Sequence, residues 1–171
     1  MIDQTFDNVY FCSPGLSNLV EDWEEEFNSK IQYLPQLPEE EFYKNIEENS
    51  LLIIDDYWDE ACNSQSTKNA FKIYSGKKNL SIFITSQNPF ESKGGRSIRN
   101  NLNYYLLFQS LGDVGINKLI ARQVGFSKLY DEAQETIGRY GFVLFNRDLS
   151  SSGFDMLFTR LFSTYPYAFR K

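Results

Sequence analysis

LLIIDDYWDE, from Leu51 to Glu60, is the stretch that decides the fold. Four aliphatic residues lead directly into Asp55 and Asp56, and two further acids follow within four residues. The apolar run does not alternate with polar residues, which is typical of a strand covered on both faces. Because functional groups of parallel sheets collect at the carboxyl ends of the strands, the two aspartates lie where a site is expected. The alternative interpretation is a surface turn that happens to be acidic.

Strand-like and helix-like segments alternate along the rest of the chain. Residues 89–101 form a basic, glycine-containing loop in this interpretation, and residues 150–171 form an aromatic tail of ambiguous structure. Strands are predicted at 8–12, 30–34, 50–56, 79–88, 102–110 and 140–148, and helices at 17–27, 37–49, 58–75, 114–125 and 127–138. This alternation predicts a single α/β domain over residues 1–171 with a mostly parallel sheet.

The composition limits which catalytic and metal-binding groups this chain can use. The 171 residues carry a net charge of −6 and contain no histidine, which excludes Ser-His and Cys-His nucleophile pairs and histidine zinc sites. Cys12 and Cys62 fit no metal spacing and are expected to be reduced thiols of an intracellular protein. The N-terminus lacks the pattern of a signal peptide, and no apolar run reaches the length of a transmembrane helix. An acidic protein of this kind would contact DNA only through a local basic loop.

Polar residues also end the strand predicted at 79–88. Gln87 and Asn88 close that strand, so two neighbouring strands would bring carboxylates and amides to one crevice. Such a set suits hydrolysis of a metal-bound phosphate, because one acid holds the magnesium shell, a second takes a proton from water and an amide positions that water. The loop that follows carries Lys93, Arg96 and Arg99, which either face a phosphate or form a mobile basic surface.

These segments together resemble the DNA-packaging ATPases of poxviruses, giant viruses, virophages and polinton-type elements, within the FtsK–HerA group of P-loop ATPases. The resemblance covers about residues 8–148. It rests on the strand ending in Asp55-Asp56, the strand ending in Gln87-Asn88, the loop Lys93–Arg96 with Asn101 behind it, the strand YYLLF, and the closing stretch LYDEAQETIGRYGFVLFNRD.

The resemblance implies roles for the matched residues. Asp55 would order Mg²⁺ through water as the Walker B acid, and Asp56 would orient or deprotonate the water that attacks ATP. Gln87 and Asn88 would sense the γ-phosphate. Arg96 would act as an arginine finger across a subunit boundary, with Asn101 as a supporting contact. The implied partners are double-stranded DNA, further copies in a ring or a P-loop-bearing partner, and a viral capsid portal or vertex. The implied location is the host cytoplasm or nucleus, or a viral factory.

The chain departs from the family pattern at the P-loop. No GxxxxGK[ST] motif occurs in the sequence, and SGKKN at 75–79 lacks the first glycine and follows a predicted helix. SLGD at 110–113 replaces the family's Pro-Arg-Asp. The expected fold is therefore a three-layer P-loop-like sandwich without its first strand and P-loop helix, from a split gene, a degenerate relative or a rearranged sheet. The alternative functions are an inactive structural subunit and a magnesium-dependent nuclease using Asp55, Asp56 and Asp59.

Overall fold

The computed structural model describes residues 6–15, 20, 23–24, 31–108, 114–137, 141–147, 156–160 and 167–169. The chain divides into two compact units, residues 1–101 and residues 102–171, and each has its own four-stranded sheet. In the part of the chain that the structure describes, every helix is too short or too polar to cross a membrane.

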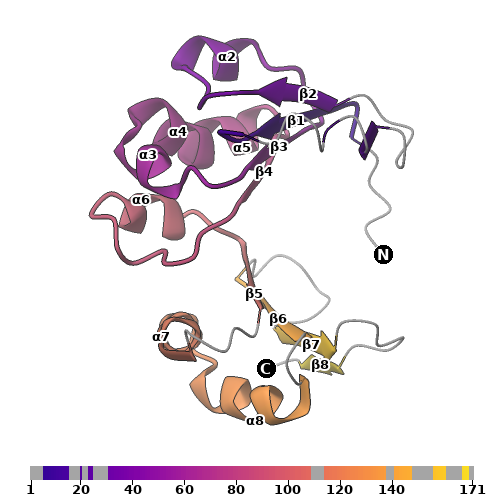
Figure 1. Cartoon of the computed structure of the whole chain (residues 1–171), viewed down its shortest axis with the longest axis vertical. Helices are drawn as coiled ribbons and strands as arrows, with labels where there is room; N and C mark the ends of the chain where they lie inside the picture. The colour runs from indigo at the N-terminus through magenta and orange to yellow at the C-terminus, as the bar shows by residue number, and fades with distance from the viewer. Residues whose placement is uncertain are drawn as a thin grey trace. The chain divides into compact units, whose positions relative to one another are not determined.

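The first unit is built on a parallel sheet (Figure 1). Its strand order is β2-β1-β3-β4, and all three pairings are parallel. The register aligns Cys12 of β1 with Ile54 of β3, and Ile54 with Ile84 of β4. The strands are β1 (Asn8–Cys12), β2 (Ile31–Leu34), β3 (Ser50–Ile54) and β4 (Ser81–Ile84).

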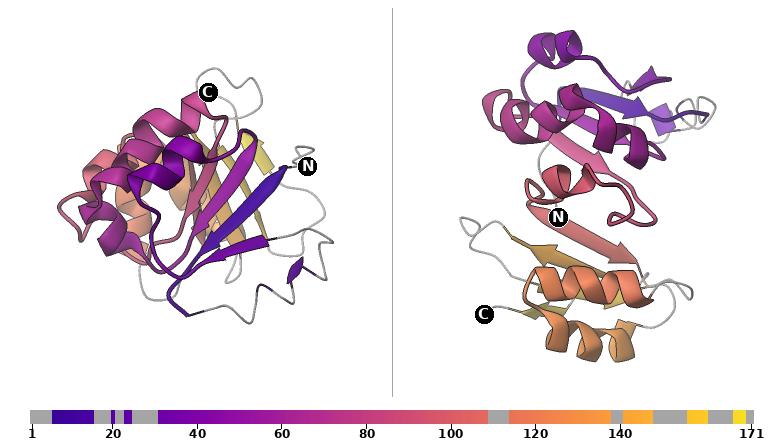
Figure 2. Two further views of the ribbon diagram at one scale, coloured as in Figure 1. Left: turned by 90° about the horizontal axis from the view of Figure 1, so that it is seen from above. Right: turned by 90° about the vertical axis from the view of Figure 1, so that its left-hand side faces the viewer.

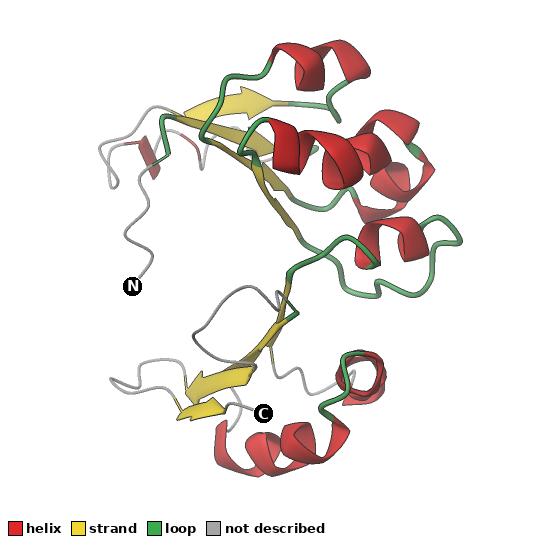
Figure 3. Ribbon diagram, turned by 180° about the vertical axis from the view of Figure 1, so that it is seen from behind, coloured by secondary structure: helices red, strands yellow, loops and turns green. Residues whose placement is uncertain are grey.

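The helices α2 to α5 of this unit lie on one face of the sheet, as the view from behind shows (Figure 3). Alternate strand residues, among them Cys12, Leu52 and Ile54, point to that face and form a core with Tyr43 and other buried side chains. The helical segments are α2 (Glu40–Asn45), α3 (Trp58–Asn63), α4 (Gln65–Asn69), the π-helical turn η1 (Ala70–Tyr74), α5 (Ser75–Lys77) and α6 (Gly95–Arg99).

The opposite face of the parallel sheet is covered unevenly. Phe11 of β1 is buried and packs edge-on against Trp23, with ring centroids 5.0 Å apart. Towards the β4 side, Ile53 is only partly buried, and Phe83 of β4 is 48% exposed. These strands are apolar on both faces. Helices cover one face, and the other face is covered only in part.

The second unit holds an antiparallel sheet of order β5-β6-β7-β8. Two helices pack together in this unit, and its elements are visible in the side view (Figure 2). Phe145 stacks on Phe126 with centroids 5.5 Å apart, which anchors β6 beneath these helices. The elements are β5 (Tyr104–Phe108), α7 (Val114–Gln123), α8 (Ser127–Ile137), β6 (Gly141–Asn146), β7 (Met156–Arg160) and β8 (Tyr167–Phe169).

The α/β class and the parallel sheet predicted from the sequence are confirmed. The aromatic tail contributes β7 and β8, and the predicted strand 102–110 pairs antiparallel with β6 in a separate sheet. The prediction of one helix over 58–75 is wrong, because Ser64 leaves the helical conformation and its hydroxyl accepts a hydrogen bond from the Thr67 backbone N–H. The predicted helix 17–27 lies mostly outside the described residues. The single domain over 1–171 stays a prediction.

Two ionisable groups in the core of the first unit predict a loss of stability in alkali. Burial raises the pKa of the Cys12 thiol from 9.0 to about 12, and chiefly burial raises the pKa of the Tyr43 hydroxyl from 10.0 to about 12. Each group therefore stabilises the folded state below its unfolded pKa, and this contribution is lost as pH rises towards 12. The free energy of unfolding, measured with urea, should fall between pH 10 and pH 12. In Tyr43→Phe this fall should be roughly 2 kcal/mol smaller than in the wild type. Equal losses in the two proteins would contradict this assignment.

Candidate functional site

The parallel ladder brings the ends of β3 and β4 side by side. The backbone N–H of Asp55 donates to the Cys12 carbonyl at 2.8 Å, and the N–H of Thr85 donates to the Ile54 carbonyl at 3.0 Å. The pairing thus continues one residue past each strand. Since aligned residues of neighbouring strands point to the same face, Ser13, Asp55 and Thr85 form a polar row across the sheet. This row lies on the face that carries Phe11 and Phe83.

A single hydroxyl organises the two aspartates. Thr85 Oγ1 donates to Asp55 Oδ1 at 2.6 Å and accepts the backbone N–H of Asp56 at 3.3 Å. Asp56 has a φ of 56°, in the left-handed region that asparagine and aspartate tolerate better than most residues. This bend turns the chain off the strand directly after Asp55. The result is one half-buried carboxylate and one exposed carboxylate at the same corner of the sheet.

Gln87 and Asn88, which follow β4, differ in the exposure and hydrogen bonding of their amide side chains. Gln87 is exposed to solvent. Asn88 is half-buried, and its Oδ1 accepts the backbone N–H of Phe90 at 3.1 Å, which closes the first turn of the next loop. Gln87 is therefore the amide that faces solvent at this strand end, whereas the carbonyl of Asn88 has a structural hydrogen bond.

The loop predicted at 89–101 contains the short helix α6 and packs against α3. A Cβ on Gly94 would lie 1.9 Å from the Cys62 carbonyl oxygen, so only glycine lets the two backbones approach this closely. A Cβ on Gly95 would lie 2.9 Å from the Trp58 ring, and Ile98 is fully buried. Gly94 and Gly95 thus serve the packing of this segment.

Charged side chains around the loop divide into fixed and exposed ones. The Arg99 guanidinium donates to the Pro89 carbonyl and lies 4.6 Å from the centre of the Phe90 ring. The Ser92 hydroxyl donates to Asp59. Arg96 and Lys93 are exposed on the same segment. Of the basic residues predicted to meet a phosphate, Arg99 has a structural role and Arg96 extends into solvent.

The structure brings some of the predicted residues together and leaves others apart. Asp55 and Asp56 share a corner with the end of β4, from which Gln87 and Asn88 follow. Asn101 follows α6, and its Nδ2 donates to the Ser97 carbonyl at 2.7 Å, at the end of that helix. Within the described ranges, no hydrogen bond or ion pair is recorded between these aspartates and Arg96 or Asn101.

Two residues of the polar row were missed by the sequence interpretation. Thr85 stands two residues before Gln87, and its alignment with Asp55 could have been inferred by extending the predicted strands in parallel. Ser13 is 1% exposed, and its hydroxyl has no hydrogen-bond partner among the described residues. No feature of the sequence around Ser13 indicates burial, because Pro14 and Gly15 suggest an exposed turn.

Asp55 and Asp56 could bind a magnesium ion only together with further ligands. Among the described residues, no three histidine, cysteine, aspartate or glutamate side chains gather closely enough to form a metal site. Mg²⁺ commonly binds through one or two carboxylates together with water and substrate phosphates. Asp55 and Asp56 can supply such a pair, so the fit is to a metal that arrives with a phosphate ligand.

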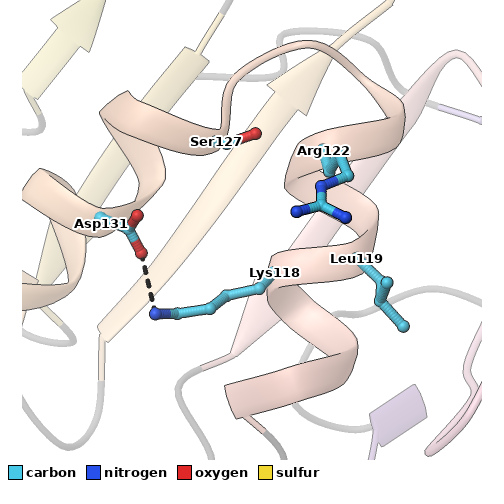
Figure 4. A pocket seen from close by; sticks show the side chains of 5 residues that line it. All are labelled: Lys118, Leu119, Arg122, Ser127 and Asp131. Carbon is cyan, nitrogen blue, oxygen red and sulfur yellow. Dashed lines mark ion pairs between the residues drawn. The ribbon is translucent and has the colours of Figure 1, made fainter.

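A separate cavity of about 190 Å³ lies in the second unit (Figure 4). Lys118, Leu119 and Arg122 of α7 line it with Ser127 and Asp131 of α8, and Lys118 Nζ lies 3.1 Å from Asp131 Oδ1. More than half of each of these two side chains is exposed, so the pair contributes little stability. None of the predicted site residues lines this cavity.

Comparison of the chain with protein-family models, with curated protein sequences and with solved structures found no match. The resemblance to packaging ATPases therefore rests on the motif residues themselves.

Gly94→Ala tests whether close packing holds the basic loop. The added methyl group would overlap the Cys62 carbonyl, so the free energy of unfolding should fall by about 2–3 kcal/mol. Gly76→Ala is the matched control, because a Cβ there meets no atom within 4 Å. It should leave stability unchanged or raise it by up to about 1 kcal/mol. Equal effects of the two substitutions in chemical denaturation would contradict the packing argument.

Thr85→Val tests the hydroxyl that organises the aspartates. Valine keeps the shape but removes the donor to Asp55 and the acceptor for the Asp56 N–H, so we expect a loss of about 1–2 kcal/mol. Thr85→Ser, which retains the hydroxyl, should recover most of that loss. If valine and serine destabilise equally in urea titrations, lost packing rather than hydrogen bonding explains the effect.

Proposed function

We propose that this chain supplies the acid and sensor part of an ATPase of the viral DNA-packaging type. The observation that carries the proposal is the corner where Thr85 joins Asp55 to the backbone of Asp56, beside the strand that leads to Gln87. Two carboxylates at one strand end with an amide after the neighbouring strand are the groups required to position a metal-bound phosphate and an attacking water.

The geometry supports a distinct role for each group. Asp55 is half-buried and oriented by Thr85, which suits a carboxylate that holds the water shell of Mg²⁺. Asp56 is exposed and can accept a proton from, or orient, the attacking water. Gln87 is the more accessible amide for contact with the γ-phosphate. Bound magnesium would neutralise charge on the phosphates.

Arg96 is the candidate arginine finger. It is exposed on α6, which the glycine contacts hold against α3, so a rigid segment presents a cation to solvent. That arrangement suits delivery of the guanidinium to a nucleotide on a neighbouring subunit. Coupling of hydrolysis to movement of double-stranded DNA, a ring of subunits and docking on a capsid vertex follow from the resemblance alone.

Hydrolysis in this proposal requires a P-loop from another polypeptide segment. The Gly76-Lys77 pair is the nearest match in the sequence, but both residues lie in α5 and follow a helical segment. A P-loop instead follows a strand and wraps the phosphates with backbone N–H groups. The proposed catalyst therefore combines these residues with a P-loop-bearing segment.

The second candidate is an inactive, ATPase-like structural subunit. It is favoured by the hydrogen bond that already engages the side chain of Asn88, a predicted γ-phosphate sensor. Among the described residues no three acidic side chains gather as a metal site, so a nuclease that would use three aspartates as metal ligands has no support in the geometry. The two remaining candidates differ in whether ATP turnover appears when a P-loop is supplied.

ATP hydrolysis by the full chain, measured with and without the strand–P-loop–helix segment of a complete packaging ATPase, tests the proposal. Magnesium-dependent turnover should appear only in the mixture and should fall by at least about 100-fold in Asp56→Asn. Asparagine is chosen because it tolerates the positive φ of this residue. Glu60→Gln, at an exposed acid of α3, is the matched control and should retain full activity. Absence of nucleotide binding and turnover in the mixture would favour the structural subunit.

A further inference from the structure

A groove of about 250 Å³ lies between the edge strand β2 and the helix α2, on the helix-covered face of the first sheet. None of the residues proposed for ATP hydrolysis lines it. A mixture of aromatic, aliphatic, amide and carboxylate groups suits an organic group that has a flat apolar surface and polar edges. The lining residues are Tyr10, Gln32, Glu41, Phe42, Asn45 and Ile46.

Tyr10 supplies a buried hydroxyl to this groove. Its side chain belongs to the core beside Tyr43, is only 7% exposed, and meets the Phe42 ring edge-on with centroids 5.1 Å apart. No hydrogen bond of the Tyr10 hydroxyl is recorded within the described part of the chain. Because a buried polar group is normally hydrogen-bonded, this hydroxyl is a group that a ligand in the groove would satisfy.

The wall of the groove formed by α2 carries a fixed carboxylate. Asn45 Nδ2 donates to Glu41 Oε1 at 2.7 Å from one helical turn further along, so the amide orients the acid. Within the described ranges, no cation forms an ion pair with Glu41. Gln32 of β2 is exposed, and the strand register places it beside Tyr10. The groove therefore offers an oriented carboxylate and two amides around the Tyr10 hydroxyl.

The charge around the groove is strongly negative. Residues 39–48 contain five glutamates and one lysine. Burial raises the pKa of the Tyr10 hydroxyl, and the nearby Glu47 carboxylate raises it further, which places a second acid close to this hydroxyl. A cation is therefore attracted to the groove, and an anion such as a phosphate is repelled.

Two simpler explanations account for the groove less well. Acids in the first turn are usual in helices, so Glu40 and Glu41 alone would indicate only a solvated surface. Such a surface does not require the unpartnered hydroxyl of Tyr10 or the ring of Phe42. A metal ion is not favoured either, because among the described residues no three acidic or thiol side chains gather as a metal site.

We propose that the groove binds an arginine side chain presented by a partner polypeptide. A guanidinium is planar and has five N–H donors, so it can lie against an aromatic ring while it donates to a carboxylate. The Glu41 carboxylate would accept from its nitrogens, the Phe42 ring would pack against its plane, and the Tyr10 hydroxyl would accept a further N–H. A lysine ammonium matches the charge but lacks the flat surface and the fork of donors.

Titration of the full chain with a capped Gly-Arg-Gly peptide, followed by residue-resolved NMR, tests the site. The side-chain amides of Gln32 and Asn45 and the backbone amide of Tyr10 should shift with one common dissociation constant. The same peptide with citrulline has nearly the same shape without the charge, and it should bind at least about tenfold more weakly. The peptide with lysine should bind at least about threefold more weakly than the arginine peptide.

Glu41→Gln should weaken binding of the arginine peptide by at least about tenfold, since it removes the charge and keeps the shape. Glu48→Gln is the matched control. It removes the same charge from an exposed acid outside the groove and should bind within about twofold of the wild type. Tyr10→Phe keeps the ring in the core and should weaken binding about threefold through loss of the hydroxyl. Circular dichroism checks that each variant is folded.

Three results would overturn the proposal. The first is the absence of shifts at Tyr10, Gln32 and Asn45. The second is equal binding of the arginine and lysine peptides, or equal losses in Glu41→Gln and Glu48→Gln, because diffuse attraction by the acidic surface explains both. The third is a set of shifts at these amides that grows with chain concentration without peptide, which assigns the groove to a second copy. Since no residue proposed for ATP hydrolysis takes part, each result leaves the proposed function as it stands.

Discussion

The parallel hydrogen-bond ladder through β1, β3 and β4 is the constraint on which the first unit depends. It sets Cys12, Ile54 and Ile84 in one row, and the next row consists of polar residues at the strand ends. Thr85 can bridge Asp55 and Asp56 only because β4 runs in the same direction as β3 and in this register. The acidic corner is thus a product of strand pairing more than of the local sequence around the aspartates.

The sequence was sufficient to locate most elements because continuous apolar runs and glycine-terminated helices are local signals. It was insufficient for the pairing of β5, since an apolar strand of this kind can pair in either direction. The break at Ser64 was missed because no proline or glycine marks it, while the side chain itself prefers to cap the next turn. Asp55, Asp56 and Gln87 could be nominated from their positions, but Thr85 required the register.

Glycines and arginines in the loop after β4 illustrate how one pattern can serve two physical purposes. Gly94 and Gly95 meet a backbone carbonyl and an indole ring, so their lack of a side chain is needed for packing. Arg99 closes the same segment on itself through Pro89 and Phe90. What remains exposed is Arg96, on a helix that the packing holds in place. The packing of the loop thereby holds Arg96 in an exposed position, and Arg96 is the residue to which the family resemblance gives a functional role.

The uncharged strand from Leu80 to Thr85 has a consequence for how this protein can be handled. Its β-branched and aromatic residues, without proline or charge, match the composition of segments that seed cross-β aggregation when a strand edge stays accessible. A segment that covers this edge would keep it from pairing with other chains. Solubility during expression would then depend on how completely the edge is covered.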